Sequence, residues 1–197
     1  MKNPNAPKKG VGKTVEPIRF LKDIRAISDM LKKSPRDHLL FVMGINNGLR
    51  TGDLLRLKVQ DVKYLKPEDS ITIVEQKTKK RNVLKINKAV FKVLQTYLDE
   101  LNPEDGEFLF ASRKGGKALT VPSVNRLIKT WTSRVNLKGR YGAHSLRKTW
   151  GYIQRVRYGT PIEIICKRYL HSSPSVTMRY LGIQDKEVDD VLLHEIG

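Results

Sequence analysis

The chain has 197 residues, and its 38 lysines and arginines outnumber its 20 aspartates and glutamates to give a formal net charge of +18. The 39% of hydrophobic residues is enough to build a core, which excludes a disordered polycation. So basic a protein favours polyanionic partners, with nucleic acid ahead of a membrane surface or an acidic protein.

The cysteine content and the apolar runs indicate in which cellular compartment the protein is expected. The single cysteine, Cys166, excludes an internal disulfide framework and a cysteine-rich zinc module, and it fits a reducing compartment. The basic N-terminus leads into no apolar stretch of the kind found in secretory signals. The longest apolar run, 39–43, is far shorter than a membrane-spanning helix. We therefore expect a cytoplasmic protein, associated with the nucleoid if DNA is its partner.

Three parts are predicted along the chain. Residues 1–15 are rich in lysine, proline and glycine, and we expect them to form a flexible basic arm because they can bury little apolar surface. Residues 16–185 carry hydrophobic patterns throughout and are expected to form one folded domain. Residues 186–197 include a short apolar stripe, Val188 to Leu192, that we expect to pack on this chain or on a neighbouring protomer.

The folded part is predicted to be α+β, mostly helical with one small antiparallel sheet. Apolar residues three or four apart predict a first helix from 18 to 31. Ser34 and Pro35 are expected to begin a second helix that ends at 47–48. The other predicted elements are a hairpin with strands 71–74 and 83–86, a short edge strand at 108–110, and helices at 87–101, 120–135, 145–158, 160–169 and 174–182.

Hydroxyl and amide side chains mark several of the helix starts. Asn87 and Ser173 are expected to act as N-caps. Thr51 is expected to cap a short helix that runs into an extended segment within 51–62. Thr160 is expected to open a capping box with Glu163.

A histidine and an arginine stand three residues apart at the start of one predicted helix. His144 and Arg147 therefore project from one face, and Gly151 continues that face one turn further on without a side chain. Such a pair beside an open stretch of backbone can hold a phosphate. The alternative is a surface histidine beside a solvated arginine.

A second histidine precedes a short helix that carries a tyrosine. Ser173 and Pro174 begin this helix and Gly182 ends it, which places Tyr180 on an ordered element nine residues after His171. A tyrosine hydroxyl can attack the phosphorus of a phosphodiester and form a phosphotyrosyl bond. The alternative for Tyr180 is a half-buried helix aromatic.

Two further segments offer groups that bind phosphate. Arg50 lies at a glycine-containing turn between two helices, where a guanidinium can bind phosphate with two hydrogen bonds and the nearby Asp53 can orient it. Asp53 can instead cap a helix. In the cationic loop of the hairpin, the ammonium of Lys77 can reach a leaving oxygen, although Lys79 or Lys80 can take the same role.

Taken in chain order, these segments resemble the catalytic domain of the tyrosine recombinases, the phage integrase family. The family pattern has an arginine in Gly-Leu-Arg-x-x-(Glu/Asp)-Leu, a hairpin lysine, a His-x-x-Arg pair, a histidine followed by two serines, and a tyrosine nine residues beyond it. The matching residues here are Arg50 with Asp53, Lys77, His144 with Arg147, His171 and Tyr180. The match runs from about residue 17 to 182, and it implies the family's DNA breaking-rejoining catalytic fold for residues 16–185.

The resemblance implies a site-specific DNA recombinase that uses neither metal nor ATP and needs no cofactor. The resemblance implies that Tyr180 is the nucleophile and that Arg50, Arg147 and His171 bind the phosphate. It implies that Lys77 is the general acid and that His144 acts as acid/base catalyst. Asp53 is implied to orient a residue that binds the phosphate without touching the phosphate itself. The implied partner is double-stranded DNA. The resemblance implies a homotetramer on DNA, with a monomer as an option in the absence of DNA. Accessory DNA-bending proteins are a further implied partner. Integration, excision, inversion and dimer resolution are all open as outcomes.

The sequence departs from the family pattern in two places. Leu170 stands where the family usually has glycine, immediately before the histidine. The chain also lacks room for the helical core-binding domain that most members carry, so both a natural minimal enzyme and a fragment are open. Two other functions are weighed: a DNA-binding regulator that does not cut, against which the complete set of six groups argues, and a type IB topoisomerase-like enzyme that relaxes supercoils.

Overall fold

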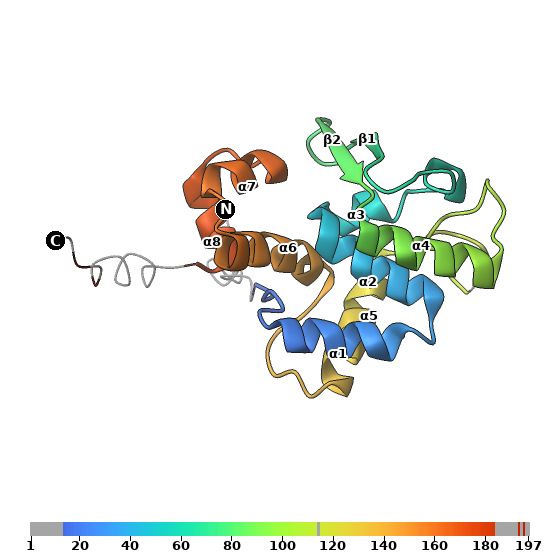
Figure 1. Ribbon diagram of the computed structural model, residues 1–197, viewed down its shortest axis with the longest axis horizontal. Helices are drawn as coiled ribbons and strands as arrows, with labels where there is room; N and C mark the ends of the chain where they lie inside the picture. Colours follow the sequence, from blue (N-terminus) through green and yellow to red (C-terminus); the bar gives the residue numbers. More distant parts are fainter. Residues whose placement is uncertain (1–13, 114, 184–192, 194, 196–197) are drawn as a thin grey trace, which may run out of the picture.

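The computed structural model describes residues 14–113, 115–183, 193 and 195, and it is mostly helical with one small antiparallel sheet, as predicted (Figure 1). Its helices are α1 (Leu21–Leu31), α2 (Pro35–Asn47), α3 (Thr51–Leu54), the 3-10 helix η1 (Val59–Asp61), α4 (Lys88–Leu101), α5 (Val121–Arg134), α6 (Ala143–Tyr158), α7 (Ile162–Tyr169) and α8 (Pro174–Leu181). Strands β1 (Ser70–Val74) and β2 (Arg81–Lys85) pair antiparallel, with Ser70 opposite Lys85.

The described range bears on the predicted arm and tail. Residues 1–13 of the arm and the stripe 188–192 of the tail lie outside the described residues. At the other end of the predicted arm, Val15 is partly buried, and the next residue, Glu16, donates its backbone N–H to the carbonyl of Arg140 at 2.7 Å. Val15 therefore lies against the folded part, and the boundary predicted at 15–16 stays a prediction. Among the described helices, none is long and apolar enough to cross a membrane.

A large hydrophobic core surrounds α2. The run from Asp37 to Gly44 is buried on every side of this helix, as expected for a helix enclosed by others. Helices α4 and α6 pack directly on α2, and α1 and α5 add residues to the same core. In Figure 1, α2 accordingly lies between α4 and α1.

A smaller core holds the C-terminal helices together. Its buried members are Ile165 and Tyr169 of α7, Leu181 of α8 and Ile183, and Trp150 of α6 packs against them. Figure 1 shows α7 and α8 grouped at one end of α6, away from α4. Because α6 contributes to both cores, side chains near its start lie between the two.

Three predicted N-caps can be compared with the structure at the level of single hydrogen bonds. The side chain of Asn87 accepts from the backbone N–H of Val90, and that of Ser173 accepts from Val176, so both predictions are confirmed. The prediction for Thr51 is wrong, because its buried hydroxyl donates to the carbonyl of Ala143 at 2.9 Å instead.

The predicted capping box at 160–163 is also wrong. The hydroxyl of Thr160 donates to the side chain of Gln154, and the residue that precedes α7 is Pro161. The hydroxyl of Thr51 is used by a partner far along the chain, and that of Thr160 by a residue six positions before it, so neither is free to cap the helix that follows.

Several element boundaries differ from the prediction for similar reasons. The first helix begins at Leu21, because the backbone N–H of Ile18 donates to the hydroxyl of Thr149 and keeps that residue extended. The expected extended segment before the hairpin contains η1. The expected edge strand at 108–110 is reduced to isolated bridges, Lys58 with Phe108 and Ala111 with Ala118.

The space beside Gly151 is filled. An added Cβ at this position would overlap the hydroxyl of Tyr169 and would lie 2.9 Å from Leu181. The interpretation of Gly151 as an opening for phosphate is therefore wrong, and the glycine instead lets α7 and α8 approach α6.

Gly151→Ala is expected to destabilise the protein by about 1–3 kcal/mol, the usual cost of overfilling a packed core. The matched control is Gly106→Ala, because a Cβ at Gly106 would meet nothing within 4 Å. Thermal unfolding of the two variants checks the difference. Equal melting temperatures for the two would contradict the close approach of α7 to α6.

Candidate active site

The two predicted arginines meet at one buried carboxylate. Arg50 precedes α3, directly after the turn at Gly48, whose φ of 59° is in the left-handed region. Its guanidinium pairs with Glu75, and Nη1 of Arg147 lies 3.9 Å from the other carboxylate oxygen of Glu75. Segments almost a hundred residues apart in sequence therefore place both guanidinium groups at the same point.

Arg147 is held rigidly from the second turn of α6. Its side chain is 2% exposed, and it donates from Nη1 to the carbonyl of Gly48 at 2.8 Å and from Nη2 to the carbonyl of Tyr169 at 2.7 Å. The guanidinium carbon also lies 4.3 Å from the ring centroid of Tyr169. Two backbone acceptors fix the plane of the guanidinium, and each terminal nitrogen keeps a second N–H.

Glu75 follows β1 and is fully buried. Its carboxylate accepts hydrogen bonds from the hydroxyl of Thr78 at 2.7 Å and from the side-chain amide of Asn82 at 2.9 Å, besides the Arg50 pair. Burial alone would raise the pKa of Glu75, but these hydrogen bonds and the charges of Arg50 and Arg147 outweigh burial and hold it below its usual value. Glu75 is therefore a carboxylate at neutral pH.

Asp53 fixes the hairpin loop rather than Arg50. One carboxylate oxygen accepts from the backbone N–H of Gln76 at 2.9 Å, and the other is buried without a partner in the described part of the chain. The carboxylate that pairs with Arg50 is Glu75, which the sequence analysis did not single out. The sequence signal available was an acidic residue at the start of an otherwise cationic loop, 75–81.

The hairpin loop brings Lys77 toward the same site. Lys77 is exposed in the turn after β1, and its positive charge is one of those that lower the pKa of His144. Lys79 has a positive φ of 57° and is also exposed. Lys80 is exposed too, so the choice of Lys77 over Lys79 and Lys80 as the hairpin lysine of the site stays a prediction.

Tyr180 lies in a cluster of rings beside Arg147. Its ring centroid is 5.5 Å from that of Tyr169 and 5.2 Å from that of His171, and Nζ of Lys148 lies 4.8 Å from it. Burial raises the pKa of the Tyr180 hydroxyl, although the charges of Arg147 and Arg50 and a hydrogen bond with Arg147 oppose that rise. The hydroxyl is therefore protonated at neutral pH and needs a proton acceptor before it can act as a nucleophile.

Both site histidines are neutral at pH 7. Burial lowers the pKa of His171 to about 4, with further lowering by the charges of Arg147 and Arg50. His144 is exposed as a residue, yet partial burial of its ring and then the surrounding charges, led by Arg147 and Lys148, lower its pKa as well. A neutral imidazole can accept a proton, and its remaining N–H can donate a hydrogen bond.

A cavity of about 470 Å³ opens over Tyr180. His144 and Lys148 line it from α6, and Tyr180 lines it from α8. The other lining residues are Thr14, Val15, Val176 and Arg179. The predicted nucleophile and a predicted acid/base residue thus border the same open space, although they are 36 positions apart in the sequence.

Two cationic residues of this region were not predicted. Lys148 is nearly buried between the cavity and the Tyr180 ring, and burial lowers its pKa. Arg168 of α7 donates to the carbonyl of Asn47 and, at 2.6 Å, to the side chain of Asn82, and burial lowers its pKa to about 10. Arg168 thereby ties the C-terminal helices to the hairpin.

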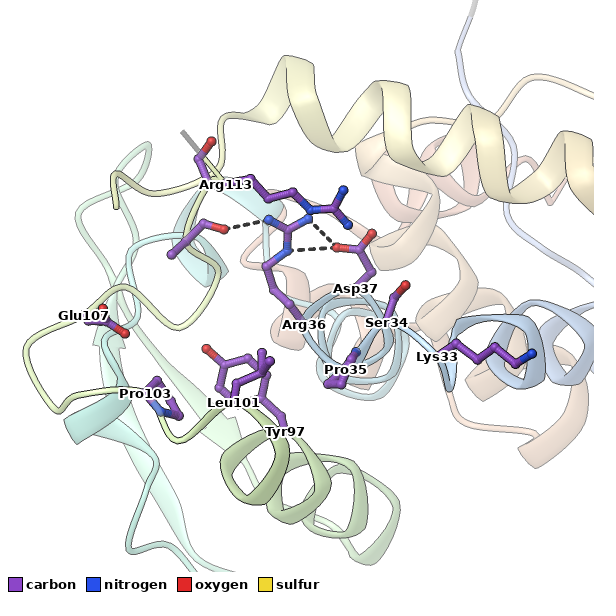
Figure 2. Close-up of a pocket in the computed structure, with 12 residues that line it drawn as sticks. Lys33, Ser34, Pro35, Arg36, Asp37, Tyr97, Leu101, Pro103, Glu107 and Arg113 are labelled. Carbon is purple, nitrogen blue, oxygen red and sulfur yellow. Dashed lines mark hydrogen bonds and ion pairs between the residues drawn. The ribbon is translucent and has the colours of Figure 1, made fainter. Parts of the chain in front are cut away.

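A second hollow, of about 370 Å³, lies between the start of α2, the end of α4 and the loop at 111–113 (Figure 2). Arg36 and Arg113 both line it, and Arg36 is bonded to the carboxylate of Asp37 and to the carbonyl of Ala111 at 2.7 Å. As Figure 2 shows, these bonds direct the guanidinium into the wall of the hollow. None of the predicted site residues lines this space, so we place the candidate site at Tyr180.

The comparisons with known proteins agree with this arrangement. The family model described as "Phage integrase family" matches residues 21–187. The chain belongs to the phage integrase family. The resemblance drawn from the spacing of Arg50, Lys77, His144, Arg147, His171 and Tyr180 is therefore confirmed at the level of the family.

Individual members of the family are similar over most of this chain. It is 34% identical over 174 residues to "Probable integrase/recombinase YoeC" of Bacillus subtilis (strain 168), covering 87% of this chain and 91% of that protein. It is 30% identical over 163 residues to "Tyrosine recombinase XerC" of Caldanaerobacter subterraneus subsp. tengcongensis, covering 80% of this chain but only 44% of that one.

A solved structure supports the fold. The catalytic domain of bacteriophage HP1 integrase has a TM-score of 0.60 and 19% sequence identity, and the match covers 90% of this chain and 94% of that one. The predicted fold class, that of a tyrosine recombinase catalytic domain, is thereby confirmed.

Proposed function

We propose that this protein is a site-specific DNA recombinase that cleaves and rejoins strands through a 3'-phosphotyrosine intermediate. Tyr180 attacks the scissile phosphorus, a P–O bond forms to its phenolic oxygen, and the bond to the 5'-oxygen breaks. The freed 5'-hydroxyl, or that of a partner strand, then attacks the phosphotyrosine and restores a phosphodiester. Ester bonds are exchanged in both steps, so no ATP is consumed.

One observation carries the proposal. The guanidinium groups of Arg50 and Arg147 converge on Glu75, and the charges of both act on the hydroxyl of Tyr180, which borders the cavity. A phosphate that enters the cavity would meet the phenol oxygen of Tyr180 together with the lining cations Lys148 and Arg179, and the charges of Arg147 and Arg50 act on the same phenol from outside the lining. A protein that only binds DNA needs cations on its surface but has no use for this convergence.

The two arginines supply the charge stabilisation that the transition state requires. The phosphorus becomes pentavalent as the phenol oxygen attacks, and negative charge builds on the non-bridging oxygens. Because Arg147 is oriented by two backbone carbonyls, it reorganises little when that charge appears. Each preorganised donor of this kind contributes about 3 kcal/mol, or roughly 10²- to 10³-fold in rate.

Protons move at two places in the reaction. The neutral imidazole of His144 takes the phenol proton of Tyr180, since both border the same cavity. Lys77 gives a proton to the departing 5'-oxygen from the turn of the hairpin. Each of these transfers contributes on the order of 10²- to 10⁴-fold, and His171 donates its imidazole N–H to the phosphate.

Double-stranded DNA is the proposed partner, and four copies of the chain are proposed to act on two duplexes. The net charge of +18 supports binding to phosphates. A structure of the same fold supports it too, since the XerH site-specific recombinase was solved bound to its palindromic difH substrate. Exchange of strands between two duplexes requires two cleavages on each, which four copies supply.

Covalent capture tests the proposal. The wild-type chain is incubated in EDTA with a library of nicked duplexes of randomised sequence, in which the fragment beyond the cut diffuses away and traps the intermediate. We expect a protein–DNA adduct that survives denaturation, with the nucleotide attached to Tyr180 by mass spectrometry. Failure to capture any duplex would favour a DNA-binding regulator, whereas relaxed circles without recombinants from supercoiled DNA would favour a topoisomerase-like enzyme.

A further inference from the structure

Glu75 joins the hairpin to both arginines of the proposed site. Its carboxylate contacts Thr78 and Asn82 on the hairpin side, and Arg50 and Arg147 on the side of the helices. Lys77, the proposed general acid, stands between Gln76 and Thr78 in the same loop. Gln76 is itself held by Asp53 through its backbone N–H.

The burial of this carboxylate argues against an incidental contact. A buried ionised group is costly unless charges and hydrogen bonds compensate it, and Glu75 is 0% exposed. Compensation comes from three separate segments: the end of the α2–α3 turn, the hairpin and α6. Backbone hydrogen bonds between Glu75 and both Lys79 and Lys80 close the loop itself, whereas the Glu75 carboxylate links it to the two arginines.

We propose that Glu75 is a positioning residue, which holds the loop of Lys77 in register with the guanidinium groups of Arg50 and Arg147. This inference rests on the proposed function. In the free enzyme the carboxylate neutralises part of the charge of both arginines and anchors Thr78, the residue after Lys77, and Asn82 on strand β2. The ammonium is then already in reach of the 5'-oxygen when the phosphate binds to the arginines.

The test compares two leaving groups in the same protein preparation. The duplex recovered by covalent capture is synthesised with the ordinary 5'-oxygen and with a bridging 5'-sulfur at the cut. Sulfur departs as a thiolate, whose conjugate acid has a pKa near 8.5, and so it needs no general acid. The measured quantity is the rate of adduct formation on the sulfur substrate divided by the rate on the oxygen substrate. Inactive protein cancels from this ratio.

We expect Glu75→Gln to raise the ratio about tenfold or more, because it slows only the step that needs the Lys77 proton. Thr78→Val, which removes one hydrogen bond to Glu75 and preserves the charge pair, is expected to raise it less. The double variant Glu75→Gln with Lys77→Ala should show the ratio of Lys77→Ala alone, because the two act on one proton transfer. Glu100→Gln, at an exposed position on α4, should leave the ratio unchanged.

Three results would overturn the inference. The first is that Glu75→Gln slows adduct formation equally on both substrates, which would mean that Glu75 acts only through the two arginines or only in folding. The second is a ratio in the double variant that is the product of the two single effects. The third is an unchanged ratio in Lys77→Ala. Failure of the proposed function is distinguishable from all three, since the wild type would then form no adduct on either substrate.

Discussion

Tyr180→Phe is expected to reduce covalent capture of DNA to background. The substitution removes the hydroxyl and leaves the ring, which packs edge-on against Tyr169 and His171 with centroids 5.5 and 5.2 Å away. We therefore expect the variant to keep its fold and its affinity for DNA. Denaturing electrophoresis of capture reactions measures the adduct, and retention of the same DNA on native gels measures binding.

The appropriate control is a tyrosine outside the site. Tyr158, at the end of α6, is 67% exposed, and Tyr158→Phe should form adduct at the wild-type rate. Tyr169 is a poor alternative nucleophile, because it is fully buried, its hydroxyl donates to the carbonyl of Arg147, and burial raises its pKa. An adduct that persists in Tyr180→Phe would contradict the assignment of the nucleophile, and one lost equally in Tyr158→Phe would contradict the site.

Local sequence was sufficient where a structural feature depends on neighbours along the chain. Asn87 and Ser173 each cap a helix through a backbone N–H three residues away, so the pattern alone predicts them. The left-handed conformation of Gly182 at the end of α8 follows in the same way.

Features that depend on distant partners could not be predicted. Threonine is a residue type that often caps helices, but Thr51 is the first residue of α3 and Arg50 precedes the helix. The hydroxyl of Thr51 donates to the carbonyl of Ala143 instead of capping. The space beside Gly151 looked open in sequence, and Tyr169 fills it from the next helix.

The candidate site shows the same division. The spacing of its arginines, histidines and tyrosine was enough to indicate the family, because the pattern fixes their order along the chain. The contacts among them were not visible, since they depend on how segments nearly a hundred residues apart are packed. Glu75 was missed for this reason: a glutamate beside lysines in a loop is usually solvated, and its burial results from packing against Arg50 and α6.

Arg147→Lys is expected to slow adduct formation by about 10²-fold or more, the loss typical of a missing preorganised donor. A lysine keeps the positive charge, but a single ammonium cannot reproduce the planar set of N–H groups that reaches Gly48 and Tyr169 and also lies near Glu75. One buried carbonyl is left unpaired, which we expect to lower the free energy of unfolding by about 1–3 kcal/mol. Single-turnover capture and thermal unfolding measure the two effects.

The control for Arg147→Lys comes from the same helix. Arg157 is exposed near the end of α6, so Arg157→Lys changes the same chemical group without touching the site. Both variants preserve the net charge, and both should bind DNA as tightly as the wild type at equal salt, since nonspecific affinity follows the number of neutralised phosphates. A rate loss confined to Arg147→Lys then reflects the geometry of the guanidinium. If Arg147→Lys cleaved at the wild-type rate, positive charge alone would suffice at this position, and preorganisation by the two carbonyls would have no part in catalysis.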